Sequence, residues 1–120
     1  MIENTNDLKV AVPSSGGEGG IIYNVTTKVD NDISAEWLQW IIHEHITQVK
    51  ATGCFYDAIA LQLLETDDTE GPTYAVQYKA ESRALYNLYI EKFAPEMRQK
   101  SFDKWGNKII AFRSLMKVVN

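Results

Sequence analysis

The sequence predicts one α+β domain of the ferredoxin-like class, with the order β-α-β-β-α-β and a four-stranded antiparallel sheet. Three observations support this prediction. The 120 residues have the length of one domain, and the 45% of hydrophobic residues suffice for one core. Four segments are rich in β-branched and aromatic residues. Two amphipathic helical segments separate the first of these from the second, and the third from the fourth.

Residues 1 to 20 are predicted to form a flexible N-terminal extension, or linker, that leads into the domain. Residues 13 to 20 read PSSGGEGG, which is the composition of a linker. Apolar residues alternate at Leu8, Val10 and Val12, so a short accessory strand is the alternative. We therefore expect the domain to occupy residues 21 to 120.

The first strand and the first helix follow this extension. Residues 21 to 29, IIYNVTTKV, have the composition of a strand. Ser34 can cap a helix that runs to about Ala51, because its hydroxyl can accept a hydrogen bond from a free backbone N–H of the first turn. Gly53 supplies the left-handed residue with which many helices end.

A hairpin is predicted next. Residues 55 to 65 and residues 73 to 80 are rich in apolar residues and have the composition of the second and third strands. The polar run TDDTEGP at residues 66 to 72 between them consists largely of turn-forming residues. The two strands are therefore expected to pair.

The second helical segment and the last strand complete the order. Ser82 can cap a helix whose apolar residues recur at spacings of three and four, until Pro95 interrupts it. Because proline suits the first turn of a helix, we expect a shorter helix to restart there and to end at Gly106. Residues 108 to 119 are predicted to form the last strand.

Both faces of the predicted sheet are apolar. Along the last strand one face carries Ile110 and Phe112, and the other carries Ile109 and Leu115. Two helices can cover only one face, so the other needs a further layer, and a second copy of the same sheet is the simplest source. This predicts a homodimer through one sheet face. The alternative is ordinary surface apolarity, which most proteins tolerate.

Composition excludes several classes of partner. There are 16 acidic and 12 basic residues, for a net charge of −4, and no basic run, so neither nucleic acid nor an anionic membrane is an expected partner. No apolar stretch approaches the ~20 residues of a membrane span. The single Cys54 cannot form an internal disulfide, which suits the cytoplasm. Neither a metal site nor a cofactor is indicated by the motifs present.

The candidate for chemistry in the first helix is His45. On a helical wheel it points into the apolar arc, whereas His43 lies about 160° away among polar residues, so the two cannot share a metal ion. A histidine on an apolar face needs a partner for its ring nitrogens, because an unpaired buried polar group is costly.

Five polar strand residues are the candidate partners of His45. If several of them converge on it, they line a small-molecule pocket between helix and sheet, where His45 can act as a general base or as a hydrogen-bonding group. The alternative is a core histidine bonded to a carbonyl or to a tyrosine hydroxyl. An open cavity that reaches a histidine with a strongly shifted pKa favours an enzyme, and a packed, satisfied ring favours a binding or structural domain. The five candidates are Tyr23, Asn24, Gln77, Tyr78 and Arg113.

Arg113 interrupts an otherwise apolar strand face. It can bind a carboxylate or phosphate of a ligand, or it can pair with an acidic residue across the dimer. The three tryptophans are expected to pack in the core or at an interface, and Cys54 is expected to be a packed, inert thiol.

Several segments resemble a known family. They are IIYNVT at residues 21 to 26, WLQW at 37 to 40, ATGCF at 51 to 55, GPTYAVQY at 71 to 78, and AFRSLMKVV at 111 to 119. Together they resemble the small bacterial family known as domain of unknown function 4286, which is common in Bacteroidetes and also has a histidine where His45 stands. The resemblance implies a dimeric α+β barrel and brings neither a known activity nor catalytic residues.

Three hypotheses for function follow. The first is a dimeric domain that binds a small molecule or a protein partner without catalysis. The second is a cofactor-independent or haem-related enzyme of the dimeric-barrel type, a monooxygenase or an isomerase, which uses His45 with Tyr78 or Arg113. The third is a regulatory module that senses an amino acid. A fold alone does not choose among these hypotheses.

Overall fold

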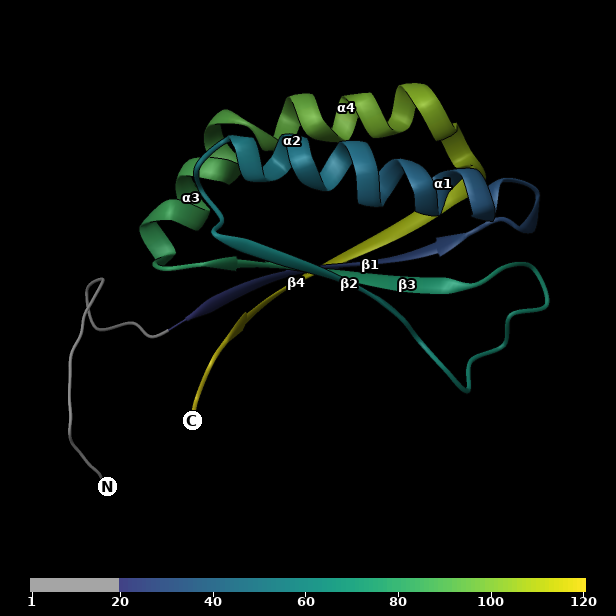
Figure 1. Ribbon diagram of the computed structural model, residues 1–120, viewed down its shortest axis with the longest axis horizontal. Coiled ribbons are helices and arrows are strands. Elements are labelled where there is room, and N and C mark those ends of the chain that lie inside the picture. The colour runs from purple at the N-terminus through teal and green to yellow at the C-terminus, as the bar shows by residue number, and fades with distance from the viewer. Residues whose placement is uncertain (1–19) are drawn as a thin grey trace.

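Residues 20 to 120, which the computed structural model describes, form a four-stranded antiparallel sheet with all helices on one of its faces (Figure 1). The predicted ferredoxin-like class and the order β-α-β-β-α-β are confirmed. The strands are β1 (Ile21–Val29), β2 (Asp57–Gln62), β3 (Thr73–Ala80) and β4 (Ile109–Lys117), in the spatial order β2-β3-β1-β4. Residues 1 to 19 of the predicted extension lie outside the described residues.

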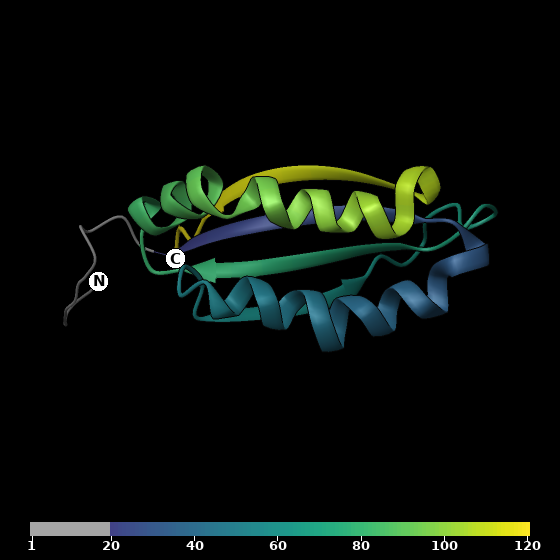
Figure 2. The same cartoon turned by 90° about the horizontal axis from the view of Figure 1, so that it is seen from above.

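The helices form two long stretches that run alongside each other over the sheet (Figure 2). The first stretch is α1 (Ser34–Trp40), a π-helical turn η3 (Ile41–His45) and α2 (Ile46–Ala51), without a break between them. The second is α3 (Arg83–Lys92) followed by α4 (Ala94–Trp105). Short 3₁₀ turns η2 (Asn31–Ile33) and η4 (Gly106–Lys108) flank them. No helix between residues 20 and 120 combines the length and the apolar character that crossing a bilayer requires.

Four predicted helix ends are confirmed, including the end of α4 at Gly106, and one is wrong. Ser82 caps α3 by accepting a hydrogen bond from the backbone N–H of Leu85 at 3.2 Å, and Gly53 adopts a left-handed conformation with φ of 82°. Pro95 lies in the first turn of α4. Ser34 is not a cap, because the turn η2 precedes α1 and Asp30 caps that turn instead.

The strand β2 is shorter than the predicted 55 to 65. Phe55 is buried against the rings of Tyr23 and Tyr89, with ring centroids 6.0 and 4.9 Å away, so it belongs to the core under the helices and not to the ladder. Beyond Gln62 the chain leaves the sheet, and Glu65 has a positive φ of 59°.

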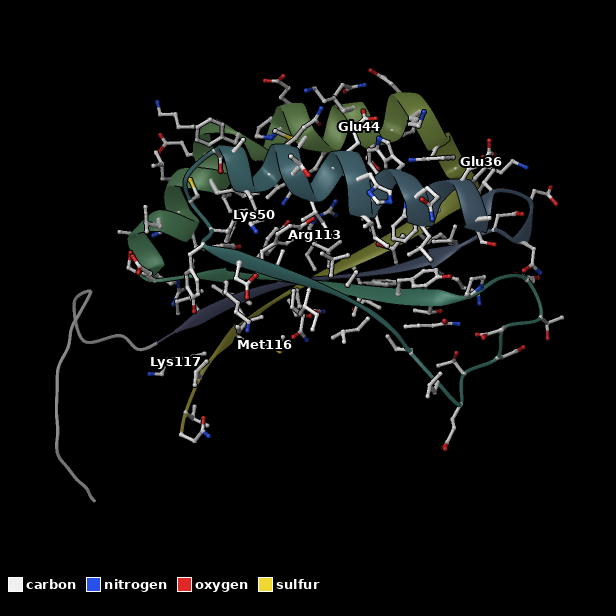
Figure 3. The ribbon with its side chains drawn as sticks, in the orientation of Figure 1. Glu36, Glu44, Lys50, Arg113, Met116 and Lys117 are labelled. Carbon is white, nitrogen blue, oxygen red and sulfur yellow. The ribbon has the colours of Figure 1, made fainter. Side chains whose placement is uncertain are left out.

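The strands alternate between a helix-covered face and an open face of the sheet. Tyr23 pairs with Tyr78 and Val25 pairs with Val76 on the helix-covered face, and all four are buried or half-buried. The open face leaves five large apolar side chains exposed, which are Ile59, Leu61, Ile110, Phe112 and Met116. Figure 3 shows Arg113 between the helices and the sheet, and Met116 on the other side of β4. The core therefore lies on one side of the sheet only.

Candidate functional site

The helix-covered face holds a cavity of about 240 Å³. Its walls come from strands β1, β3 and β4, from the first helical stretch, and from α3 and α4 with the turn η4 that follows. Aromatic and aliphatic side chains make up most of the lining, with a few polar groups among them, as in many small-molecule sites.

Four of the candidate residues line this cavity. Tyr23, Tyr78 and Arg113 reach it from the sheet, and His45 reaches it from the first helical stretch. Because Arg113 lies on the helix-covered side, it is not placed to pair across a dimer formed through the open face (Figure 3). Trp37 and Trp40 pack in the core and also line the cavity.

Gln77 does not line the cavity, so the expectation that it joins His45 is wrong. It precedes Tyr78 in β3, and neighbouring residues of a strand point to opposite faces. Gln77 pairs in register with Asn24, and both lie on the open face. Asn24 is also absent from the lining, and its amide donates a hydrogen bond to the hydroxyl of Thr26 at 2.9 Å.

The π-helical turn places His45. In this turn the backbone N–H of Ile46 donates a hydrogen bond to the carbonyl of Ile41, five residues earlier. In an α-helix, residues five apart lie about 140° apart around the axis and do not meet. Here the imidazole of His45 stacks on Trp40, five residues earlier, with ring centroids 4.5 Å apart and 23° between the planes. Single π turns of this kind are frequent at functional sites.

His45 has no satisfied partner for its buried nitrogen. Its Nδ1 atom is inaccessible to solvent and makes no hydrogen bond with any residue from 20 to 120. Burial, and secondarily the positive charge of Lys100, lowers the pKa of His45 from 6.5 to about 4, so the ring is neutral at pH 7. The expected bond to a carbonyl or tyrosine hydroxyl is therefore absent at Nδ1. Such a group is uncommon in folded proteins and invites a functional explanation.

The tyrosines of the cavity wall stay protonated. Burial, with a smaller contribution from neighbouring tyrosines, raises the pKa of Tyr78 and of Tyr89 well above the ordinary value of 10. Their hydroxyls therefore remain neutral and can donate hydrogen bonds throughout the physiological range. Tyr23 accepts a hydrogen bond from the guanidinium of Arg98 at 3.3 Å.

Arg98 is a lining residue that the sequence analysis missed. It follows the buried Met97 on α4 and precedes Phe102 by four residues, which places it beside the sheet-facing side of that helix. This spacing from Phe102 and Met97 is the signal that could have found it. The cavity thus has a second guanidinium opposite Arg113, on the helical side.

Trp37 contributes another unpaired polar group. Its indole Nε1 is buried and makes no hydrogen bond with the described part of the chain, although an indole N–H usually finds a partner when buried. Within residues 20 to 120, no three histidine, cysteine or acidic side chains are grouped to hold a metal ion. The arrangement can bind a small molecule through the arginines and the tyrosine hydroxyls of the cavity wall.

The fold and this cavity define a class of protein, the ferredoxin-like α+β domains whose solved representatives include proteins described as dimeric. The chain belongs to the family described as "Domain of unknown function (DUF4286)", whose model matches residues 20–119. The resemblance seen in the sequence motifs is confirmed to that extent. No curated protein matches the chain.

Three solved structures illustrate the similarity. A dimeric ferredoxin-like protein from an uncultured marine organism has a TM-score of 0.61 at 15% identity, over 86% of this chain and 98% of that one. A monooxygenase of Streptomyces coelicolor in complex with nanaomycin D has a TM-score of 0.60 at 15% identity, over 86% and 90%. A hydroxynitrile lyase of Passiflora edulis has a TM-score of 0.58 at 15% identity, over 86% and 98%. At such identities the likeness extends to the fold alone.

Proposed function

We propose that the protein is a homodimer, joined through the open face of its sheet, that binds a small molecule in the cavity between helices and sheet without catalysing a reaction. The observation that carries the proposal is a cavity of about 240 Å³ whose mostly apolar lining includes His45, Tyr78 and two arginines. We further propose that residues 1 to 20 are an extension outside the domain. The buried free thiol of Cys54 is compatible with a proposed location in the cytoplasm.

The dimer is supported by the open face. Five large apolar side chains are exposed there, on the two edge strands β2 and β4, and a second copy of the sheet would remove them from water. The helices of one subunit lie on the other face and cannot cover it (Figure 1). Similar solved structures are described as dimeric, which agrees with this proposal.

Sedimentation of two matched variants tests the dimer. Phe112 on the open face and Phe102 on α4 are 65% and 64% exposed, so a charge at either position is tolerated by the monomer. We expect Phe112→Asp to sediment as a monomer at micromolar concentration, because it would bury a carboxylate in the interface. Phe102→Asp should remain dimeric. A monomeric wild-type protein, or dissociation of both variants alike, would contradict the dimer.

Ligand binding is supported by the unpaired groups of the cavity. Nδ1 of His45 and Nε1 of Trp37 lose their hydrogen bonds to water on folding and regain none from residues 20 to 120. An unpaired buried polar group costs about 1 to 3 kcal/mol, and of the three such side-chain atoms in residues 20 to 120 two belong to lining residues, while the third, Nε1 of Trp105, does not.

A thermal-shift screen tests the pocket. Small acids, amines and neutral aromatic compounds, with haem as an additional probe, are added to the wild type and to Ala111→Trp, which fills the cavity from β4. We expect at least one compound to raise the Tm of the wild type and not that of Ala111→Trp. Ala84→Trp, the same change at an exposed position on α3, should respond as the wild type does. The absence of any hit, or hits that survive Ala111→Trp, would refute the proposed pocket.

A second candidate function is catalysis, and the state of His45 favours it. An open cavity reaching a histidine with a strongly lowered pKa is the feature that we expected of an enzyme. The neutral imidazole of His45 can accept a proton from a bound substrate, while Tyr78 or Arg113 stabilises the negative charge that develops. With a pKa of about 4, however, His45 is a weak base at neutral pH, so binding is the better-supported function.

The two candidates differ in the response of His45→Gln. If the protein is an enzyme, prolonged incubation with a compound found in the screen changes the mass of that compound, and His45→Gln abolishes the change. If the protein only binds, the compound is recovered intact. Haem is several times larger than a cavity that holds about ten to fifteen non-hydrogen atoms at interior packing density, so no step through haem is proposed.

A further inference from the structure

We propose that the ligand of this cavity is a small monocarboxylate with a planar, largely apolar body, and that Arg98 and Arg113 bind its carboxylate. This inference rests on the proposed binding function and names the chemical class that the cavity selects. It follows from the charges of the lining residues, from the partners that these residues lack, and from the nature of the walls.

The charge of the cavity is opposite to that of the chain. The sequence contains 16 acidic and 12 basic residues, yet the lining residues include two arginines and neither aspartate nor glutamate. A random sample of this surface would instead contain more acidic than basic residues. The lining therefore favours an anion over a cation or a neutral molecule.

Neither arginine has an ionic partner within residues 20 to 120. Arg98 donates to the hydroxyl of Tyr23 at 3.3 Å, and no carboxylate of the described residues lies within 4.0 Å of either guanidinium. A guanidinium carries five donors, arranged to match the two oxygens of a carboxylate. Most of these donors remain available to a ligand.

Arg98 and Arg113 both lie near the tyrosines of the cavity. The positive charges of Arg98 and Arg113 both lower the pKa of Tyr89, although burial raises it more, so both lie within electrostatic reach of one hydroxyl. Arg113 is also in register with Val25, two residues along β1 from Tyr23, to which Arg98 donates. A carboxylate between the two guanidinium groups would also meet these tyrosine hydroxyls.

The carboxyl-terminal end of α4 disfavours a ligand group with two negative charges. Gly106, which ends α4, lines the cavity, and the unpaired carbonyls at the end of a helix carry a partial negative charge. Among residues 20 to 120, the lining includes no glycine-rich loop or helix amino terminus that would offer backbone N–H groups to a phosphate. A single negative charge held by side chains fits these conditions better.

The walls define the body of the ligand. Trp37, Trp40 and the imidazole of His45 line the cavity from the helices, and tyrosines line it from the sheet, so flat surfaces face the space. Planar groups pack favourably against such rings. At the packing density of protein interiors, a volume of about 240 Å³ accommodates a molecule of roughly ten to fifteen non-hydrogen atoms.

Calorimetric titration with a matched pair of probes tests this inference. The full chain is titrated near neutral pH with 2-naphthoate and with 2-naphthamide, which has the same shape and no charge. We expect 2-naphthoate to bind at least about tenfold more tightly, because a hydrogen bond to a charged group contributes more than a neutral one. Arg98→Gln and Arg113→Gln should each weaken the binding of 2-naphthoate by about tenfold or more and leave the affinity for 2-naphthamide unchanged.

Lys117→Gln is the matched control. It removes one positive charge from the same strand as Arg113, on the same side of the sheet, at an exposed position outside the cavity. We expect its affinity for 2-naphthoate to equal that of the wild type. Circular dichroism and Tm confirm that each variant is folded.

The outcomes separate this inference from the function on which it rests. If both probes bind equally, or if the arginine variants bind 2-naphthoate as the wild type does, the cavity binds small molecules but the assignment to carboxylates is wrong. If Lys117→Gln weakens binding as much as the arginine variants, general surface charge is responsible and the assignment is again wrong. If neither probe binds, the carboxylate assignment fails, and the screen with Ala111→Trp decides the proposed function separately.

Discussion

The two faces of the sheet are incomplete in different ways, one in hydrogen-bond partners and the other in apolar cover. On the helix-covered face the apolar side chains are buried, but polar atoms of His45 and Trp37 are buried without partners. On the open face Asn24 is paired with Thr26 and Lys79 is paired with Asp57 at 3.8 Å, but large apolar side chains are exposed. One face is incomplete in hydrogen bonds and the other in apolar cover.

This difference indicates what kind of partner each face fits. Unpaired buried nitrogens are satisfied by a small polar molecule, whereas exposed apolar area on a flat sheet is satisfied by another surface of similar extent. The same sheet therefore separates a proposed ligand site from a proposed protein interface. The predictions below test this separation, from the largest expected effect to the smallest.

Truncation of the helix-covered core should have the largest effect. Trp37 is 2% exposed and its ring centroid lies 5.3 Å from that of Tyr74, so Trp37→Ala should lower the free energy of unfolding by about 3 to 5 kcal/mol. Tyr56 immediately precedes β2 and its ring is exposed, so Tyr56→Ala should lower the free energy of unfolding by less than about 1 kcal/mol. Urea unfolding measures both, and equal losses would contradict the contrast in burial.

The second prediction concerns pH. Because the pKa of His45 is about 4 in the folded state and 6.5 in the unfolded state, the unfolded state binds more protons between these values. Stability should be fully present above pH 6.5 and should fall by about 2 to 3 kcal/mol as the pH drops to 4. His45→Gln should remove this part of the pH dependence, and His43→Gln, which changes an exposed ring, should retain it. Identical pH profiles of the two variants would show that His45 is not desolvated.

Dilution should destabilise the protein if the open face joins two copies. Each tenfold dilution should reduce the apparent stability by about 1.4 kcal/mol per mole of dimer, because dissociation then accompanies unfolding. Thermal unfolding over two decades of concentration measures this. Phe112→Asp should abolish the dependence of the Tm on protein concentration, and Phe102→Asp should retain it. A wild-type Tm independent of concentration would remove the case for the interface.

The smallest effects should have opposite signs on the two faces. Thr26→Val leaves the amide of Asn24 without its 2.9 Å partner and should cost about 1 kcal/mol. His45→Phe replaces an unpaired buried group with an apolar ring and should raise stability by about 1 kcal/mol, at the expense of ligand binding. Chemical denaturation of both variants measures the signs, and a destabilised His45→Phe would indicate that the imidazole has a partner in the folded protein.

The fold was predictable because each element carries its own local signal. Ser82, Gly53 and Pro95 act through one or two hydrogen bonds or one backbone angle, and such effects are visible in a short stretch of sequence. Ser34 was misassigned because a 3₁₀ turn with its own cap at Asp30 precedes the helix. A sequence pattern does not distinguish a 3₁₀ turn from the first turn of a helix.

The candidate site was predictable only in part. Tyr23, Tyr78 and Arg113 lie around one cavity because the strand period places them on one face of the sheet, and the π-helical turn brings His45 to the same cavity. Gln77 was an error that strand alternation alone should have excluded once Tyr78 was chosen. Arg98 was missed, although its spacing from Met97 and Phe102 places it beside the sheet-facing side of α4.

The π-helical turn was not predictable from a period of 3.6, and it has a further consequence. The turn adds one residue per turn at residues 41 to 45, so the number of residues between Trp40 and Gly53 fixes how the second half of the helix meets the sheet. Removing one residue within the turn would restore a regular α-helical turn and take His45 off Trp40, whereas removing one elsewhere in the helix would rotate everything after it by about 100°. This helix should therefore tolerate changes in the identity of its exposed residues far better than a change in its length.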